Sequence, residues 1–541
     1  MTQDTPAFFT LDRGTVSTTA ALVAPVDGRY RLLASAAAPV RLDPESVLED
    51  LVWRVARTDA SVAGSMESWR DWSRLEVHSG RVPRAVLVAA SAETGALLER
   101  AFRAAGWHVA ARFFGQEPAV TELGAACLEP ELDAVVVGGR DGVVEAEHEA
   151  GHRLWSRASS LARFRDDLAV VAAGPFAERP EGIPDRRLFA LPAPDPLSGT
   201  AESMLRQAAT QVGRHLAAGG QPVAADARTA LRTAMASLAA VLEVNVDGIE
   251  IGAAAGSRTV STPQAEQAHA VLAEAGLFPE GLLDDDELGE ATLRWCTLPS
   301  GDPAFRLDGL RELALRPWVT VGRDGWHLRL AAVRAALERL EKAWREGQDE
   351  AASEPAAGAT VLSGGAFAGL PPAASALALI DGVRRAGAMS ILHDHAGLLA
   401  PLGALPVEAD RQRLLADLLP DALLPLGSVV VTGAIEVPRK ERVPASLSVA
   451  SSLGDQRLRL DPGQLQLVDL PPGVSARLGI DPGESTVLGV EGRTLTLEVS
   501  GGLGGLFVDT RPIPLDLPAS GEARRSALEA WEAPAWTGAE R

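Results

Sequence analysis

Short apolar segments alternate with helical segments in the N-terminal half of the chain, and this alternation restricts the fold more than any other feature. Apolar strands are expected at 85–90, 107–111, 134–137 and 168–173, with a helix at 93–105 between the first two. Strands separated by helices form parallel sheets, because each helix returns the chain to the same edge before the next strand. The sequence therefore predicts an α/β protein with helices on both faces of a mostly parallel sheet.

Length, charge and cysteine content exclude several classes of protein. The chain has 541 residues and a net charge of −21, and Lys342 and Lys440 are its only lysines. The length favours about three domains. The acidic balance argues against nucleic acid or an anionic membrane as a partner. Cys127 and Cys296 are isolated, and the N-terminus has no signal-peptide pattern, so we expect a protein of the reducing cytoplasm.

The first apolar strand leads into a loop that can hold a phosphate. Asp12-Arg13-Gly14-Thr15 separates two apolar runs, and the hydroxyl residue Thr18 follows. Gly14 allows close approach of the backbone, Thr15 and Thr18 can donate hydrogen bonds, and Asp12 can hold a hydrated magnesium ion. Short glycine motifs of this kind are also typical of ordinary β-hairpins, so the motif alone does not decide between the two interpretations.

Three further glycine-bearing turns recur, two at the ends of apolar strands and a third on an early strand of the second lobe. They are Gly138-Gly139, Ser363-Gly364-Gly365 and the loop Asn245-Val246-Asp247-Gly248. In open α/β sheets ligands bind at the carboxyl ends of the strands. The turns together predict a cleft between two α/β lobes, whereas the alternative is that each glycine only ends a strand.

Changes in local pattern divide the chain into four parts. We expect a first lobe at 1–240, a second lobe at 241–425, an all-β module at 426–517 and an exposed tail at 518–541. The module is indicated by short β runs separated by Asp-Pro-Gly and Gly-Gly turns. The tail is expected to contain at most one helical turn, with its two tryptophans docked on the body or on a partner.

Several motifs in a fixed order resemble those of the glutamate mutase L family, whose members belong to the actin-like ATPase superfamily. The resemblance covers most of the chain. The matching segments are Asp12-Arg13-Gly14-Thr15-Val16-Ser17-Thr18-Thr19, Gly138-Gly139-Arg140-Asp141-Gly142-Val143, Ala172-Ala173-Gly174-Pro175, Gly364-Gly365, Ile391-Leu392-His393-Asp394 through Leu402-Gly403-Ala404-Leu405, and Gly501-Gly502-Leu503-Gly504-Gly505 through Pro514.

The resemblance implies a two-lobed actin-like (ribonuclease H-like) ATPase fold followed by a C-terminal all-β module. It also implies ATP and Mg²⁺ as cofactors, and a helper or chaperone role for a partner enzyme, an adenosylcobalamin-dependent mutase. The residues expected at the nucleotide are Asp12 for magnesium, Gly14, Thr15, Thr18, Gly138 and Gly139 for phosphate, and Gly364 and Gly365 for adenosine.

The chain departs from the family pattern at the phosphate loops. Thr19 stands where the family has lysine, and Asn245 stands where the second loop has an acid. Asp12, Asn245 and Asp247 are therefore the candidate catalytic positions, and the amide at Asn245 predicts impaired hydrolysis. If the strand register moves by two residues, Asp247 or Glu250 takes over the acidic role. An active ATPase and a nucleotide-binding scaffold without turnover both remain open, as does a protein that no longer binds nucleotide.

A second motif suggests a different chemistry. His148-Glu149-Ala150-Gly151-His152 fits the H-E-x-x-H pattern, in which two histidines hold zinc and the glutamate acts as a base. Charged neighbours and the helix-weakening Gly151 count against a zinc site. A zinc-dependent hydrolase is therefore the alternative to the nucleotide-binding accessory protein.

Overall fold

The computed structural model describes most of the chain. The described residues are 7–58, 68–79, 82–130, 132–140, 145–176, 180–217, 225–264, 269–273, 275–278, 286–298, 303–315, 322–346, 357–435, 443–488 and 493–537. Asp141, Gly142 and Val143 of the second glycine motif lie outside them.

The first lobe is built on a five-stranded sheet. In spatial order its strands are β10 (Ala225–Asp226), β4 (Ser73–His78), β1 (Phe8–Arg13), β2 (Ser17–Val26) and β3 (Arg29–Pro39). β1, β2 and β3 form an antiparallel meander, while β4 and β10 run parallel to β1. The buried face of β1 and β2 packs under helix α1 (Pro44–Thr58), whose residues Leu48 and Leu51 are fully buried.

The second lobe repeats this topology. The first five strands of its sheet are β13 (His269–Ala273), β12 (Gly256–Ser261), β11 (Val246–Ile251), β14 (Ala359–Ser363) and β15 (Gly387–Asp394). β11, β12 and β13 form the meander, and β14 and β15 run parallel to β11. The repeat confirms the two-lobed actin-like fold. It also shows that β1 and β11 occupy equivalent positions in their two sheets.

Helices cover the second lobe and connect it to the first. α7 (Ala227–Leu242) follows β10 and lies between the two sheets, and its apolar face shares one core with both lobes. The other helices are α8 (Asp286–Leu293), α9 (Pro303–Leu315), α10 (Gly322–Glu346), α11 (Pro372–Gly382), α12 (Leu399–Gly403) and α13 (Glu408–Ala422). In the part of the chain that the structure describes, no helix combines the length and the apolar character needed to cross a membrane.

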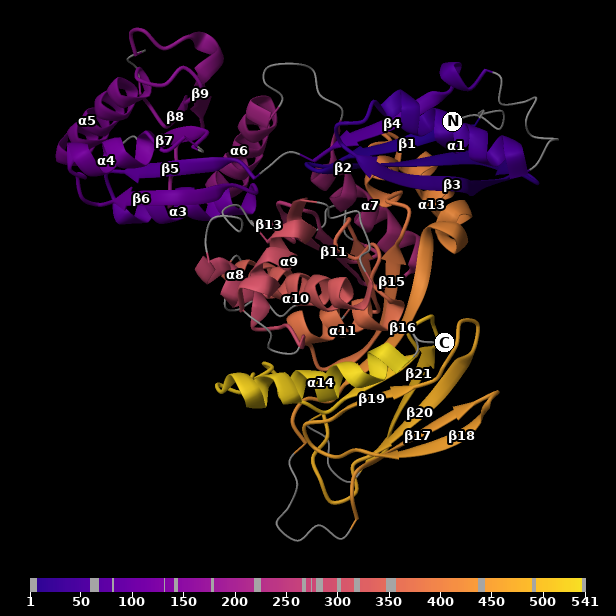
Figure 1. The fold of residues 1–541 in the computed structure, drawn as a ribbon. Coiled ribbons are helices and arrows are strands. Elements are labelled where there is room, and N and C mark those ends of the chain that lie inside the picture. The colour runs from indigo at the N-terminus through magenta and orange to yellow at the C-terminus, as the bar shows by residue number, and fades with distance from the viewer. Residues whose placement is uncertain are drawn as a thin grey trace.

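A separate parallel sheet is inserted between β4 and β10, so the range 1–240 contains two sheets rather than one. In spatial order its strands are β6 (His108–Phe114), β5 (Arg84–Ala89), β7 (Ala134–Gly138), β8 (Ala169–Ala173) and β9 (Leu188–Leu191). Its helices are α3 (Ala92–Ala104), α4 (Val120–Cys127), α5 (Glu145–Ala162) and α6 (Ala201–Ala217). The alternation of strands and helices predicted from the sequence is confirmed here, and Figure 1 shows this unit standing apart from the first-lobe sheet.

The C-terminal β strands are shared between the second lobe and a smaller sheet. β16 (Leu423–Val431), β22 (Leu506–Asp509) and β19 (Leu465–Val468) extend the second-lobe sheet beyond β15. The predicted boundary between 425 and 426 therefore falls within β16. The remaining antiparallel sheet contains β18 (Gly454–Arg459), β17 (Ser446–Ser451), β20 (Ser475–Asp481) and β21 (Leu495–Ser500).

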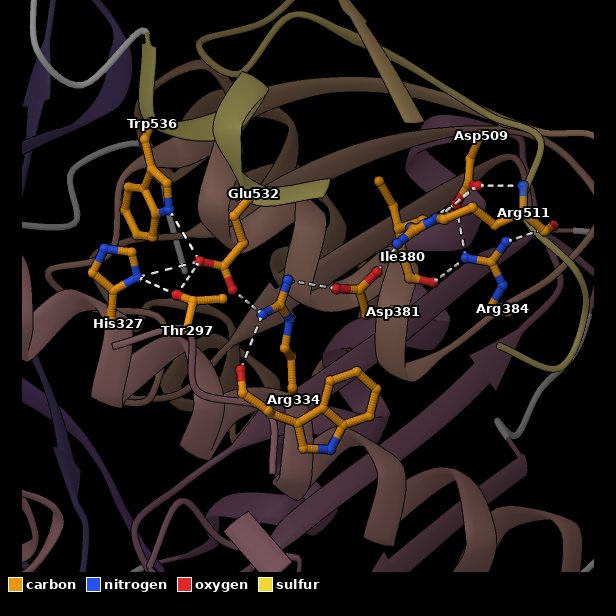
Figure 2. A network of polar contacts seen from close by, with 11 residues as sticks. Thr297, His327, Arg334, Ile380, Asp381, Arg384, Asp509, Arg511, Glu532 and Trp536 are labelled. Carbon is orange, nitrogen blue, oxygen red and sulfur yellow. Dashed lines mark hydrogen bonds and ion pairs between the residues drawn. The ribbon is translucent and has the colours of Figure 1, made fainter. Parts of the chain in front are cut away.

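The C-terminal segment is a docked helix, which corrects the prediction of an exposed tail. α14 (Gly521–Thr537) packs against α11, and Glu532 and Trp536 are buried. Figure 2 shows the buried charges that hold it: Glu532 pairs with Arg334 of α10, which also pairs with Asp381 of α11 at 2.7 Å. Asp381 also forms an ion pair with Arg511 at 2.8 Å, and Arg511 follows β22 in the chain. The network joins the C-terminal strands and α14 to the helices of the second lobe.

Candidate functional site

A cleft of about 370 Å³ lies between the two lobes. It is lined by the β1–β2 turn of the first lobe, the β11–β12 turn of the second lobe, the loop after β14 and the end of β15. The lobes touch at its margin, because a Cβ atom on Gly397 would lie 3.1 Å from Cγ2 of Thr19. The cleft therefore sits where the repeated sheets face each other.

The two hairpin turns that face the cleft have the same construction. In the first, the Gly14 N–H donates to the Ser17 carbonyl at 2.8 Å, and in the second, the Gly252 N–H donates to the Ala255 carbonyl at 2.9 Å. Each turn has an acid two residues before its glycine, Asp12 in one and Glu250 in the other. Since β1 and β11 occupy equivalent places, the two acids are related by the internal repeat.

Three carboxyl groups converge on this cleft. Burial, reinforced by the charges of Glu250 and Asp394, raises the pKa of Asp12 to about 7, and Arg228 acts in the opposite direction. The Oδ1 atom of Asp12 is buried and has no hydrogen-bond partner. Burial also raises the pKa of Glu250, although Arg228 and the hydroxyl of Ser257 oppose it. A site that concentrates negative charge in this way favours a cation.

Asp394 is held rigidly at the end of β15. Its carboxylate accepts hydrogen bonds from the Leu398 N–H at 2.9 Å, the Leu399 N–H at 3.2 Å and the Ser363 hydroxyl at 3.1 Å. Burial nevertheless raises its pKa, because these donors offset desolvation only in part. The arrangement fixes Asp394 beside the loop that follows β14.

The loop after β14 is built for close approach of the backbone. Gly364 has φ +91°, and a Cβ there would lie 2.4 Å from the Ile251 carbonyl oxygen, so only glycine fits. At Gly365 a Cβ would meet nothing within 4 Å, which leaves this position open. The buried Arg329 of α10 donates to the carbonyls of Gly365 at 3.3 Å and Ala368 at 2.7 Å. Arg329 thereby holds the loop in shape.

The structure brings together only some of the residues expected at the nucleotide. Asp12, Gly14, Thr15, Gly364 and Gly365 all line the cleft. Thr18 does not: its side chain is 1 % exposed, because alternate residues of a strand point to opposite faces. The neighbouring residues Ser17 and Thr19 line the cleft in its place.

The structure does not place Asn245 or Asp247 among the cleft residues. Asp247 is buried in ion pairs with Arg258 at 3.1 Å and with Arg385 at 3.1 Å, and the Asn245 carbonyl accepts from the Gly358 N–H at 2.9 Å. The acid of the second turn is Glu250, at the alternative register that the sequence left open. Asn245 does not occupy the position of the second-turn acid, so its amide gives no reason to expect impaired hydrolysis.

Gly138 and Gly139 lie in a different place from the other glycine turns. They end β7 of the inserted sheet and line a small hollow beside His148, His152 and Phe176. The prediction that all glycine turns share one cleft is therefore wrong for this pair. The topology explains the error, because the inserted sheet has its own carboxyl edge.

The hollow beside α5 does not have the geometry of a zinc site. The His148 and His152 rings contact each other with centroids 4.5 Å apart. The Glu149 side chain is 64 % exposed and pairs with Arg153 at 3.6 Å. Among the residues that the structure describes, no group of three His, Cys, Asp or Glu side chains is arranged to hold a metal ion. These observations count against the zinc hydrolase alternative.

Sequence reasoning missed several cleft residues as site residues. They are Ser17, Arg228, Gly252 and Asp394. A comparison of the two hairpins could have found Gly252 and selected Glu250 as the acid, because Asp12-x-Gly14 and Glu250-x-Gly252 have the same spacing after an apolar strand. No local pattern marks Arg228, which reaches the cleft from the first turn of α7.

Neither a protein-family model nor a curated protein matches the sequence. Three solved structures resemble the fold at 10 % identity. The activator of 2-hydroxyisocaproyl-CoA dehydratase from Clostridium difficile with bound ADPNP covers 75 % of this chain and 96 % of its own, with a TM-score of 0.26. The match to a nucleotide-free acetone carboxylase covers 84 % of this chain and 80 % of the carboxylase chain, with a TM-score of 0.28. The match to a ligand-bound xylulose kinase from Lactobacillus acidophilus covers 76 % of this chain and 92 % of the kinase chain, with a TM-score of 0.26. Similarities this weak carry no argument about activity.

Proposed function

We propose that the protein binds ATP with Mg²⁺ in the cleft between its lobes and acts as a nucleotide-dependent accessory protein for a partner enzyme. The observation that carries the proposal is the pair of equivalent acid-x-glycine turns that face one cleft, with the buried Oδ1 of Asp12 left without a hydrogen-bond partner. Two turns from opposite lobes suit a ligand with several phosphates, because each turn can hold one end of the phosphate chain.

The residues of the cleft fit a magnesium ion that enters together with a nucleotide. Asp12 offers a buried oxygen atom that lacks a donor, and a carboxylate is a preferred ligand of this cation. Because the described residues contain no three-residue metal group, water and phosphate oxygens would complete the coordination. A bound magnesium ion would neutralise part of the negative charge of the phosphates.

The other cleft residues divide into phosphate-side and nucleoside-side groups. Thr15 and Ser17 of the first turn, with Ala253 and Ala254 of the second, would contact the phosphates. The open position at Gly365 would face the nucleoside. Glu250 is the candidate to orient an attacking water. Arg228 supplies a positive charge to the cleft, which has threonine at position 19 where the family has lysine.

The partner is proposed on sequence resemblance alone. The ordered motifs shared with the glutamate mutase L family suggest an adenosylcobalamin-dependent mutase as the enzyme served. Nucleotide binding would change the balance between an open and a closed arrangement of the lobes, and the partner enzyme would respond to that change. A nucleotide shifts this balance only if its affinity differs between the two arrangements.

Gly365→Trp is expected to abolish nucleotide binding while leaving stability unchanged. The new side chain has free space at its first atom and would extend into the cleft, so it blocks the ligand rather than the fold. We expect an affinity loss of at least about 100-fold for a non-hydrolysable ATP analogue, measured by isothermal titration calorimetry with Mg²⁺.

Gly199→Trp is the matched control. Gly199 is exposed, and a Cβ there also meets nothing within 4 Å, but it lies before α6 and away from the cleft. Its affinity should equal that of the wild type. Undiminished binding by Gly365→Trp would contradict the assignment of the cleft.

A further inference from the structure

A second groove, of about 740 Å³, adjoins the cleft beside β12 and the first turn of α7. It is bounded by α7, by β12 and β13 of the second lobe, and by the ends of α3 and α6 of the inserted unit. Ser257 lines this groove and donates to Glu250 at 2.8 Å, while Glu250 lines the cleft. Arg228 lines both spaces, so the groove and the cleft share a wall.

The groove is cationic in a chain with a net charge of −21. Its charged and titratable lining residues are His78, His215, Asp226, Arg228, Arg232 and Arg411. Asp226 is the single carboxylate among the described lining residues, and its Oδ2 is engaged as the cap of α7 by the Thr229 N–H at 2.8 Å. An excess of arginine in an acidic protein attracts a negatively charged ligand.

Arg411 is the most deeply placed of these cations. Its side chain is 7 % exposed, and it donates to the Ser237 hydroxyl at 2.7 Å and to the Leu405 carbonyl at 2.5 Å. Both acceptors are neutral, and the acidic residue that acts on its charge is Glu408, one turn earlier in α13. These contacts fix the guanidinium at the wall of the groove.

The rest of the lining combines hydroxyl and apolar groups. Thr229 and Thr233 of α7 and Thr259 of β12 offer hydroxyls, while Ala105, Leu272 and Leu405 form apolar parts of the wall. A groove of this size can hold a ligand as large as a nucleotide. The mixed lining favours a ligand with an anionic head and an apolar body.

We propose that this groove binds a second ligand, an anionic small molecule that carries a phosphate group on an apolar body. Arg232, His215 and Arg411 bind the phosphate, and the alanine and leucine side chains contact the body. Arg228 connects this site to the nucleotide cleft. The existence of the site does not depend on the function proposed for the cleft.

The test is calorimetric titration of the full chain with hexyl phosphate and with inorganic phosphate. The experiment uses the Gly365→Trp variant as well as the wild type, so that binding in the nucleotide cleft is removed. Hexyl phosphate should bind both proteins equally, and at least about tenfold tighter than inorganic phosphate, because each buried methylene contributes about 0.8 kcal/mol.

The double variant Arg232→Gln/His215→Gln should weaken hexyl phosphate binding by at least about tenfold. Arg206→Gln is the matched control, because Arg206 is exposed on α6, the helix that carries His215, and does not line the groove. An unchanged melting temperature shows that each variant is folded. Absence of hexyl phosphate binding to Gly365→Trp, or equal binding by the double variant, would overturn the proposal. ATP binding by the wild type would stand in either case.

Discussion

Glu532→Ala is expected to destabilise the protein by about 3–5 kcal/mol, because it removes one of the two carboxylates that pair with a fully buried arginine. Arg334 has a fully buried side chain and pairs with Glu532 on one side and Asp381 on the other. Glu532 also accepts from Thr297 at 2.8 Å and from the Trp536 indole N–H at 3.2 Å. Burial opposes ionisation of Glu532, but Arg334 and the donors His327 and Thr297 prevail and lower its pKa to about 2. The pair is therefore charged at neutral pH.

Urea denaturation followed by tryptophan fluorescence measures this loss, since Trp536 lies within the network (Figure 2). Glu529→Ala on the exposed face of the same helix is the control, and its effect should stay within about 0.5 kcal/mol. Glu532→Gln keeps the shape but removes the charge, so its effect should be intermediate. A loss below about 1 kcal/mol for Glu532→Ala would show that α14 is not held as described.

The network matters for the cleft because of the helices it joins. α11 follows the Gly364–Gly369 loop, and α10 carries both Arg334 and the loop-holding Arg329. The C-terminal helix therefore supports the same two helices that shape one wall of the candidate nucleotide site. We expect loss of α14 to affect stability and cleft geometry together.

Asp12→Asn is expected to stabilise the free protein by about 2 kcal/mol at pH 8 and to weaken magnesium-dependent nucleotide binding at least about tenfold. The pKa of Asp12 rises from its usual 3.8 to about 7 in the folded protein. Between these values the unfolded chain is ionised while the folded protein still holds the proton, so stability falls as pH rises from about 4 to about 7. The full shift corresponds to about 4 kcal/mol, and partial exposure of Asp12 to the cleft reduces this figure.

The pH dependence of stability distinguishes loss of the Asp12 charge from a change in stability that is the same at every pH. The asparagine side chain carries no charge at any of these pH values, so the gain in stability should vanish at pH 4 and be complete above pH 7. Asp455→Asn, at an exposed position on β18, is the control and should leave the profile unchanged. The melting temperature from pH 4 to pH 8 measures both. An Asp12→Asn variant that is less stable than the wild type at pH 8 would contradict the account of the carboxyl cluster.

The sequence predicts much of the fold because its patterns are local. The strands near 85–90 and 134–137 and the helix at 93–105 are confirmed as β5, β7 and α3, because apolar periodicity depends on neighbouring residues alone. Assignment of these strands to a separate inserted sheet depends on pairing between distant segments, which periodicity does not encode. The same limit explains why Gly138 was expected in the cleft.

Agreement with the family pattern predicts the lining of the cleft only in part, because Thr18 and Gly138 match the pattern but do not line the cleft. Asp12 and Gly364 lie at the cleft as expected. In the second lobe the strand runs to Ile251, so Gly252 forms the turn and Glu250 is its acid, whereas Gly248 lies within the strand. A shift of this kind changes which residues reach the turn. Docking of the C-terminal tryptophans on the body or on a partner was expected, but the long helix α14 and its buried charges were not, because those charges resemble the charges of an exposed helix in sequence.

Calorimetric titration of the wild-type chain with a non-hydrolysable ATP analogue, with and without Mg²⁺, tests the central claim most directly. We predict binding that requires Mg²⁺, is weakened at least about tenfold by Asp12→Asn, is abolished by Gly365→Trp and is unchanged by Gly199→Trp. Absence of binding to the wild type in the presence of Mg²⁺, or equal affinity in Gly365→Trp, would contradict the claim that this cleft is a nucleotide site.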